Sequence, residues 1–187
     1  MQTNLQTPIE IRSQIWKELT RSVHDKHHAW RTPVFSTLSI DGGVSSRTVV
    51  LRSVNESAGQ LSIYTDSRSS KVLELRANLK SNFVFWNSRL RWQLRVRCEV
   101  SILTEGPLVE SLWQRVSQSA AVSDYISASA PGSNLVEEGE LVMNQKDTVN
   151  YFTVIICEIK EMDWLELAGK SHRRAKITGE SWLWLNP

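Results

Sequence analysis

The sequence lacks the features that mark secreted, disulfide-bonded or membrane-spanning chains. It has only two cysteines, Cys98 and Cys157, both in strand-like segments, where a free cysteine behaves as a small hydrophobic residue. We therefore expect buried, reduced thiols rather than a disulfide framework. The first residues lack the basic and apolar segments of a signal peptide, and no apolar run approaches the roughly 20 residues of a membrane helix. We interpret the chain as cytoplasmic.

Several functional motifs are also missing. There is no GxGxxG, GxxxxGK(S/T) or GxSxG, so Rossmann, P-loop and hydrolase interpretations have no starting point. The run HDKHH at residues 24–28 has no cysteine partners and no HExxH spacing. We interpret it as a solvated loop and expect no metal.

Positive charge is unevenly distributed. The net charge is only +2, but residues 47–97 contain ten Lys or Arg against three Asp or Glu, a local charge of +7 that leaves −5 for the rest. This asymmetry indicates an anionic ligand near the middle of the chain. A solvated basic surface would give the same count, so charge alone leaves both interpretations open.

The length predicts one domain, residues 1–187, that buries roughly 70% of its unfolded surface. Apolar residues three or four apart predict helices at 8–23, from Ser69 or Ser70 onward, and at 107–119. The second helix carries an apolar stripe of Val72, Leu75 and Leu79. A further helix at 137–147 would also fit the sequence.

Short β-rich segments fill most of the remaining chain. The Asp-Gly-Gly turn at 41–43 predicts a hairpin of two strands within residues 34–52. Further strands are expected at 61–65, 83–86, 91–103, 151–159, 163–167, 173–178 and 181–185. About eight strands joined mainly by short turns favour an antiparallel barrel over a parallel βαβ sheet.

The strand RWQLRVRCEV, residues 91–100, alternates between two kinds of side chain. Every second residue from Trp92 onward is apolar, whereas the residues between them are mainly basic. Because side chains two apart in a strand share a face, one face is suited to the core and the other to a ligand or solvent. Gln93 lies on the basic face, and its amide could match a ring carbonyl beside a ring nitrogen.

A second candidate site lies where residues 69–71, Ser-Ser-Lys, open a predicted helix. Arg47 and Arg52 bracket the nearby run RTVVLR. Helix amides, the helix dipole and formal charge together favour a phosphate, although an ordinary capped helix with a surface lysine is the alternative. Tyr64 and Trp164 could flank a planar ligand, but either could equally be a core aromatic residue.

Five motifs in this order resemble the pyridoxamine 5'-phosphate oxidase family of FMN-binding split barrels. They are RTVVLR (47–52), YT with SSK (64–71), RWQLRV (91–96), DWLEL (163–167) and HRR (172–174). The similarity runs from about Val34 to the C-terminus and is strongest to a branch described as oxidase-related. It implies a mainly β fold with short helices, an antiparallel Greek-key split β-barrel, and FMN as the cofactor.

The resemblance also implies individual roles. Arg47 would reach the FMN phosphate or ribityl chain, and Lys71 would bind the phosphate. Gln93 would contact the isoalloxazine ring, and Trp164 and Arg174 would complete the site from the partner subunit of a homodimer. The implied cofactor-binding residues are Arg47, Thr48, Val49, Val50, Leu51, Arg52, Tyr64, Thr65, Ser70, Lys71, Gln93, Trp164 and Arg174.

The departures from the family concern mainly the substrate. Lys170, Ser171 and His172 stand where the classical oxidases have Arg-Leu-His, and Arg52 replaces a lysine that touches substrate phosphate. We take His172, Lys170 and Arg52 as the candidate catalytic residues. The remaining substrate-phosphate set has no clean counterpart, with Arg115 and Ser119 as candidates only.

Two cofactor positions also differ. Ser70 stands where the family has an arginine, and Arg68 could supply the phosphate contact of that arginine. APGS (130–133) stands where the family has a Gln-Ser pair that contacts FMN.

The leading hypothesis is an FMN-dependent oxidase resembling pyridoxamine 5'-phosphate oxidase, with a B6 vitamer phosphate as candidate substrate. Hydride would move from a substrate carbon to the flavin, which oxygen would reoxidise. The altered substrate positions keep open an FMN-binding reductase or flavin-binding protein with a different substrate. A barrel that binds single-stranded nucleic acid is more remote, because Trp92 lies on the face opposite the arginines. Neither nucleic acid nor a membrane is expected as a partner.

Overall fold

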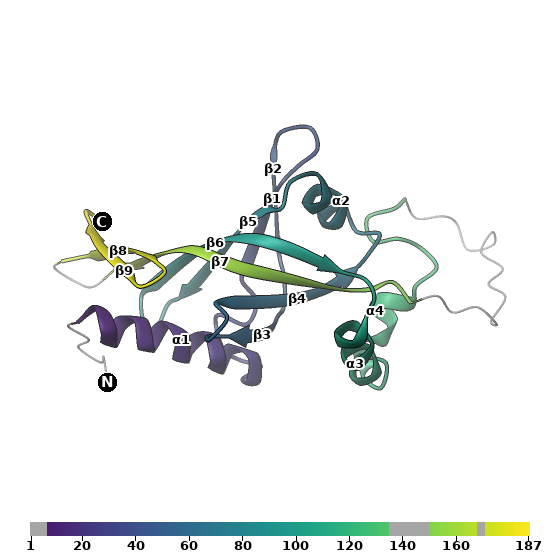
Figure 1. Cartoon of the computed structure of the whole chain (residues 1–187), viewed down its shortest axis with the longest axis horizontal. Coiled ribbons are helices and arrows are strands. Elements are labelled where there is room, and N and C mark those ends of the chain that lie inside the picture. Colours follow the sequence, from purple (N-terminus) through teal and green to yellow (C-terminus); the bar gives the residue numbers. More distant parts are fainter. Residues whose placement is uncertain (1–6, 135–149, 168–170) are drawn as a thin grey trace.

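The computed structural model describes residues 7–134, 150–167 and 171–187. In these ranges the chain forms one antiparallel sheet with short helices around it (Figure 1). The strands are β1 (Val34–Leu38), β2 (Val44–Thr48), β3 (Leu51–Asn55), β4 (Gln60–Asp66), β5 (Lys80–Asn87), β6 (Trp92–Leu103), β7 (Phe152–Glu166), β8 (Arg173–Thr178) and β9 (Ser181–Leu185). The helices are α1 (Pro8–His24), α2 (Ser70–Ala77), α3 (Pro107–Val116) and α4 (Ser123–Ile126), with a 3-10 turn at Ala120–Val122.

The sheet is not closed. Its strands follow the order β2-β1-β5-β6-β7-β4-β3, and among the described strands the two ends of this path, β2 and β3, do not pair with each other. The expected fold class, a mainly antiparallel split barrel with short helices, is confirmed.

The long strand β7 organises the sheet. One of its edges pairs with β6 from Val154 to Glu166. The other edge pairs first with β4, at residues 152–158, and then with β8, at residues 162–166. The sheet therefore forks along β7, next to a register irregularity between Arg97 and Cys98 of β6.

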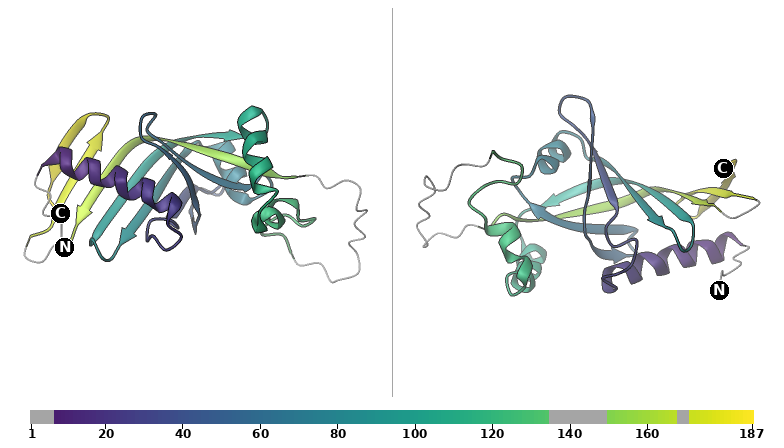
Figure 2. Two further views of the ribbon diagram at one scale, coloured as in Figure 1. Left: turned by 90° about the horizontal axis from the view of Figure 1, so that it is seen from below. Right: turned by 180° about the vertical axis from the view of Figure 1, so that it is seen from behind.

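The core lies on the inner face of this curved sheet and is covered by α1, which crosses the sheet in the left view of Figure 2. Ile11, Ile15 and Leu19 of α1 are fully buried and join the cluster that contains Phe35, Phe83 and Trp164. The helix begins with a capping box in which Thr7 and Glu10 bond to each other's backbone N–H, and such a box satisfies two free amides of the first turn. The predicted helix at 8–23 is confirmed.

The two faces of β6 behave as the alternation predicts. Trp92, Leu94 and Val96 are buried, whereas Gln93 and Arg95 on the other face are only half-buried. Cys98 and Cys157 are buried free cysteines.

Three details of the expected elements are wrong. The run 47–52 is not one strand, since β2 ends at Thr48 and β3 begins at Leu51. The two strands expected at 151–159 and 163–167 are the single strand β7. Leu79 lies beyond α2 and is 44% exposed, so it does not belong to that helix's buried face.

The helix considered at 137–147 lies outside the described residues. Within the described ranges, no helix is both long and apolar enough to cross a membrane.

Candidate functional site

Arg47 and the start of α2 form the first cluster of candidate site residues. Arg47 on β2 donates to the carboxylate of Glu74 on α2 at 2.9 Å, and to the hydroxyls of Thr37 and Ser45. Thr37, which is 3% exposed, in turn donates to Glu74. These bonds tie β1, β2 and α2 together around one guanidinium group.

Lys71, in the first turn of α2, lies beside this group. Its ammonium donates to Thr65 Oγ1 at 3.0 Å, and Thr65 Oγ1 lies 3.0 Å from the hydroxyl of Ser69, the N-cap residue. Burial lowers the pKa of Lys71, and the charge of Arg47 lowers it further. A lysine whose charge is disfavoured by burial and by a neighbouring cation provides a favourable place for an anion. We call Arg47, Thr65, Ser69 and Lys71 the cation cluster.

Ser70 and Arg68 border the cation cluster. Ser70 is exposed at the first position of α2. Arg68 is held by Asp66, by carbonyl oxygens of residues 127–129, and over the Tyr151 ring at 3.4 Å. These contacts engage much of the Arg68 guanidinium, and its role in place of the arginine that the family has at Ser70 stays a prediction.

The segment between β2 and β3 follows the cation cluster in the chain. Thr48 is exposed, Val49 and Val50 are half-buried, and Leu51 is fully buried. The amides of Val49 and Leu51 donate to the carbonyls of residues 33 and 31, which holds the segment extended.

Arg52 and Tyr64 belong to a second cluster. The Arg52 guanidinium lies 5.6 Å from the centre of the Tyr64 ring, within cation–π range. Tyr64 packs edge-on against Phe152, as does Tyr125 of α4. Burial raises the pKa of Tyr125, and the charge of Arg52 acts in the opposite direction. Tyr64 and Thr65 are neighbours in β4, so they point to opposite faces of the sheet and into different clusters.

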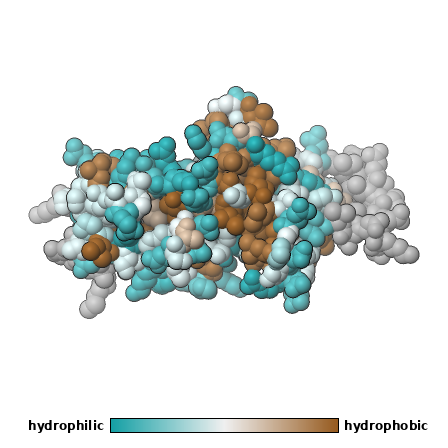
Figure 3. Space-filling view, in the orientation of Figure 1, coloured by the Kyte–Doolittle hydropathy of each residue, from teal (hydrophilic) through white to brown (hydrophobic). Residues whose placement is uncertain are grey.

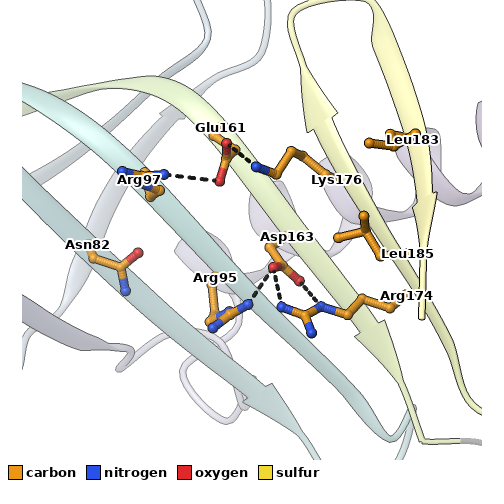
Figure 4. Close-up of a pocket in the computed structure, with 9 residues that line it drawn as sticks. All are labelled: Asn82, Arg95, Arg97, Glu161, Asp163, Arg174, Lys176, Leu183 and Leu185. Carbon is orange, nitrogen blue, oxygen red and sulfur yellow. Dashed lines mark hydrogen bonds and ion pairs between the residues drawn. The ribbon is translucent and has the colours of Figure 1, made fainter. Parts of the chain in front are cut away.

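The basic face of β6 lines a pocket of about 570 Å³ (Figure 4). In it Asp163 of β7 accepts from Arg95 on one side and from Arg174 on the other, the latter at 2.9 and 3.0 Å. Glu161 similarly bridges Arg97 and Lys176. Each carboxylate is thus shared by two cations, and the pocket keeps an excess of positive charge.

Gln93 lies on the same sheet face as Arg174. It pairs with Leu165, and Leu165 pairs with Arg174, so one apolar side chain separates the amide from the guanidinium. Trp164 points the other way. It is fully buried, and its ring contacts Trp92 at a centroid distance of 5.2 Å. The structure therefore does not bring Trp164 and Gln93 to a common surface of one chain.

The candidate catalytic residues are only partly described. His172 is exposed just before β8, Arg52 lies in the second cluster, and Lys170 is outside the described residues. No group of three or more potential metal-ligating side chains is found in the described ranges.

Sequence reasoning missed the groups that hold the arginines in place. Glu74 and Thr37 hold Arg47, and Asp163 holds Arg174. The spacing of Glu74, three residues after Lys71 on a predicted helix, was the available signal, because residues three apart share a helix face.

Comparison with known proteins agrees with this fold. The family model described as "Pyridoxamine 5'-phosphate oxidase, FMN-binding domain" matches residues 13–104, about half of the chain. No curated protein sequence matches. A pyridoxamine 5'-phosphate oxidase-related, FMN binding protein from Nostoc punctiforme has a similar structure, with a TM-score of 0.73 and 20% identity over 98% of this chain and 100% of that one.

Two further structures with this fold are named for different ligands. PhzG from Burkholderia lata, solved with tetrahydrophenazine-1-carboxylic acid, has a TM-score of 0.74 at 18% identity and full coverage of both chains. A heme binding protein from Mycobacterium smegmatis has a TM-score of 0.53 at 13% identity, covering 88% of this chain and 58% of that one.

The open antiparallel sheet with its short helices is the split-barrel fold that the Nostoc punctiforme protein also has. Within that fold, residues 13–104 match the model of the pyridoxamine 5'-phosphate oxidase family.

Proposed function

We propose that the protein binds FMN and acts as an FMN-dependent oxidoreductase of the pyridoxamine 5'-phosphate oxidase type. The observation that carries this proposal is the cation cluster, in which Arg47 and Lys71 meet at the N-terminus of α2 beside the hydroxyls of Thr65 and Ser69. Partly buried cations, hydroxyl donors and a helix N-terminus fit the phosphate end of FMN.

The proposed roles follow this placement. Arg47, Ser70 and Lys71 would hold the phosphate, residues 48–52 and Thr65 would line the cofactor, and Gln93 would contact the ring. When bound, FMN supplies two-electron redox chemistry, and the chain must then bind and orient the substrate. We assign that part to Arg52, His172 and Lys170.

The site would be shared between two copies of the chain. Arg174 lies on the outer face with Gln93, one strand beyond Leu165, which suits an approach to the cofactor of a second copy. We therefore propose a homodimer, in which each chain, residues 1–187, acts as a single domain. The buried position of Trp164 supports a role in shaping this face from behind rather than in contacting the ring.

A second candidate is an FMN-binding reductase or flavin-binding protein with another substrate. It is favoured by Arg52, which packs on the Tyr64 ring, and by Lys170 and Ser171, which stand in place of the Arg-Leu that precedes the histidine in the family. The complex of the similar PhzG with a tricyclic carboxylic acid supports a search beyond B6 vitamers.

The test is the visible spectrum of the protein reconstituted with FMN, followed by anaerobic addition of pyridoxamine 5'-phosphate. We expect the bound flavin to bleach and its colour to return in air. Bound flavin that stays oxidised would contradict the oxidase activity and leave the second candidate, whereas absence of binding would contradict both.

A pair of variants tests the phosphate site directly. Arg47→Gln should weaken FMN binding by about tenfold or more, since it removes a charged donor. Arg76→Gln, which removes an exposed cation from α2, should leave the affinity unchanged. Equal effects of the two substitutions would reject the cation cluster as the phosphate site.

A further inference from the structure

Glu74 is a buried carboxylate behind the proposed phosphate site. It is only 6% exposed and lies one helical turn after Lys71 on α2. Its Oε2 atom accepts from the Thr37 hydroxyl at 2.5 Å and from Arg47 Nη2 at 2.9 Å. A buried carboxylate with charged and neutral donors on one oxygen is fixed in position.

The hydrogen bonds of Arg47 show what this carboxylate does. A guanidinium has five N–H groups, and Arg47 uses Nη1 for Thr37 and Nη2 for both Ser45 and Glu74. Nη2 is thereby saturated from the side of the protein. The remaining N–H groups, on Nε and Nη1, are then the ones that an external anion could engage, and their direction depends on where Glu74 holds Nη2.

Glu74 also sets the charge of the site. Burial acts to raise the pKa of Glu74, but the hydrogen bonds from Thr37 and Arg47 outweigh it and the pKa is lowered. Glu74 is thus ionised at neutral pH and offsets one of the two cations. The charge that remains is positive, which favours a phosphate over a neutral group at the same place.

We infer that Glu74 is a positioning residue, which orients Arg47 toward the phosphate and so determines how strongly the protein prefers a phosphorylated flavin over an unphosphorylated one. This inference rests on the proposed function. It concerns only the phosphate end of the ligand, because Glu74 bonds to Arg47 and Thr37 and lies beneath the cation cluster.

The experiment compares the dissociation constants of FMN and riboflavin, measured by flavin fluorescence, for the wild type and two substitutions of Glu74. Glu74→Ala removes the acceptor, so Arg47 loses its orientation. We expect FMN affinity to fall about tenfold and riboflavin affinity to change less than about twofold. Glu74→Gln keeps an acceptor oxygen for Arg47 and Thr37 and should therefore preserve the preference for FMN.

The controls separate this role from general destabilisation. Thr37→Val, which removes the hydroxyl that joins Glu74 and Arg47, should also reduce the preference, and it serves in place of Glu74→Ala if that variant does not fold. Arg76→Ala on the exposed side of α2 should change neither constant. A loss of affinity for both flavins in parallel would indicate a merely structural role and overturn the inference.

The outcomes also separate the inference from the proposed function. A wild type that prefers FMN, together with Glu74→Ala and Thr37→Val variants that keep the same preference, would overturn the role of Glu74 alone. A wild type that binds FMN no better than riboflavin would overturn the proposed phosphate site, and the inference with it.

Discussion

Lys71 combines burial with a neighbouring positive charge, and this combination has a consequence for pH. Burial, and then the charge of Arg47, lowers the pKa of Lys71 below the ordinary value of 10.5. The side chain therefore loses its charge at a lower pH than an exposed lysine does. A bound phosphate dianion stabilises the charged form, so FMN binding and protonation of Lys71 favour each other.

We expect FMN affinity to decrease as the pH rises from 7 to about 10, through the lowered pKa of Lys71. Riboflavin affinity should stay level over the same range. Lys71→Arg keeps its charge and should remove most of this decrease. Fluorescence titrations at several pH values provide the measurement, and identical pH profiles for the two ligands would contradict the prediction.

At the scale of single residues, the sequence could predict which charged side chains form the site but not which side chains hydrogen-bond to them. Arg47 and Lys71 were expected at a phosphate site, because a basic residue in the first turn of a helix is a local signal. The hydrogen bonds that Glu74 accepts from Arg47 and Thr37 join residues 27 and 37 positions apart in the chain. No periodicity marks such a contact, since it depends on how α2 docks on β1 and β2.

Asp163 joins three strands around the pocket of about 570 Å³. It links β6, β7 and β8 through Arg95 and Arg174. Burial acts to raise the pKa of Asp163, but the hydrogen bonds from Arg174 and Arg95 outweigh it and lower the pKa below 3.8. A lowered carboxyl pKa stabilises the fold above the unfolded-state pKa, and this contribution disappears as the pH falls through the folded-state value.

Asp163→Asn should therefore lower the free energy of unfolding by about 2 kcal/mol at neutral pH. The difference in the free energy of unfolding between this variant and the wild type should shrink below about pH 4, where Asp163 of the unfolded chain is protonated. Urea denaturation at several pH values is the measurement. Glu158→Gln, in an exposed ion pair of the same strand, is the control and should change stability by less than about 0.5 kcal/mol. A pH-independent difference for Asp163→Asn would contradict this explanation.

Element types were predicted better than element limits. The periodicities of α1 and β6 predicted both elements, because each presents one continuous apolar face to the core. The break between β2 and β3 at Val49 and Val50 was missed, since both residues favour strands and the break follows from hydrogen bonds to residues 31 and 33. The joining of two expected strands into β7 was missed because the intervening Lys160 and Glu161 are polar.

For the whole molecule, the exposed hydrophobic surface is the feature that a second copy would cover. Hydrophobic residues gather in a band across the middle of the face shown in Figure 3. On the sheet face that carries Gln93, Trp86 pairs with Gln93 and is 46% exposed. Exposed large apolar side chains around a polar site are typical of an interface.

We expect the protein to sediment as a dimer, and Trp86→Glu to shift it toward the monomer by placing a charge in the proposed interface. Ile9→Glu on α1, where the isoleucine is 81% exposed, is the matched control and should remain dimeric. Sedimentation velocity at micromolar concentration is the measurement. A monomeric wild type would exclude the proposed dimer. A Trp86→Glu variant that stays dimeric would place the interface elsewhere.

The fork in the sheet at β7 also bears on how the chain folds as it is synthesised. β1, β2, β5 and β6 can pair once residue 103 has emerged from the ribosome. The β3–β4 hairpin has no partner on its β4 edge until residues 152–158 are made. That edge stays open while the roughly 85 residues between β4 and β7 are added, at roughly 5–20 residues per second. During those seconds the open β4 edge is a surface on which a strand of another chain could pair.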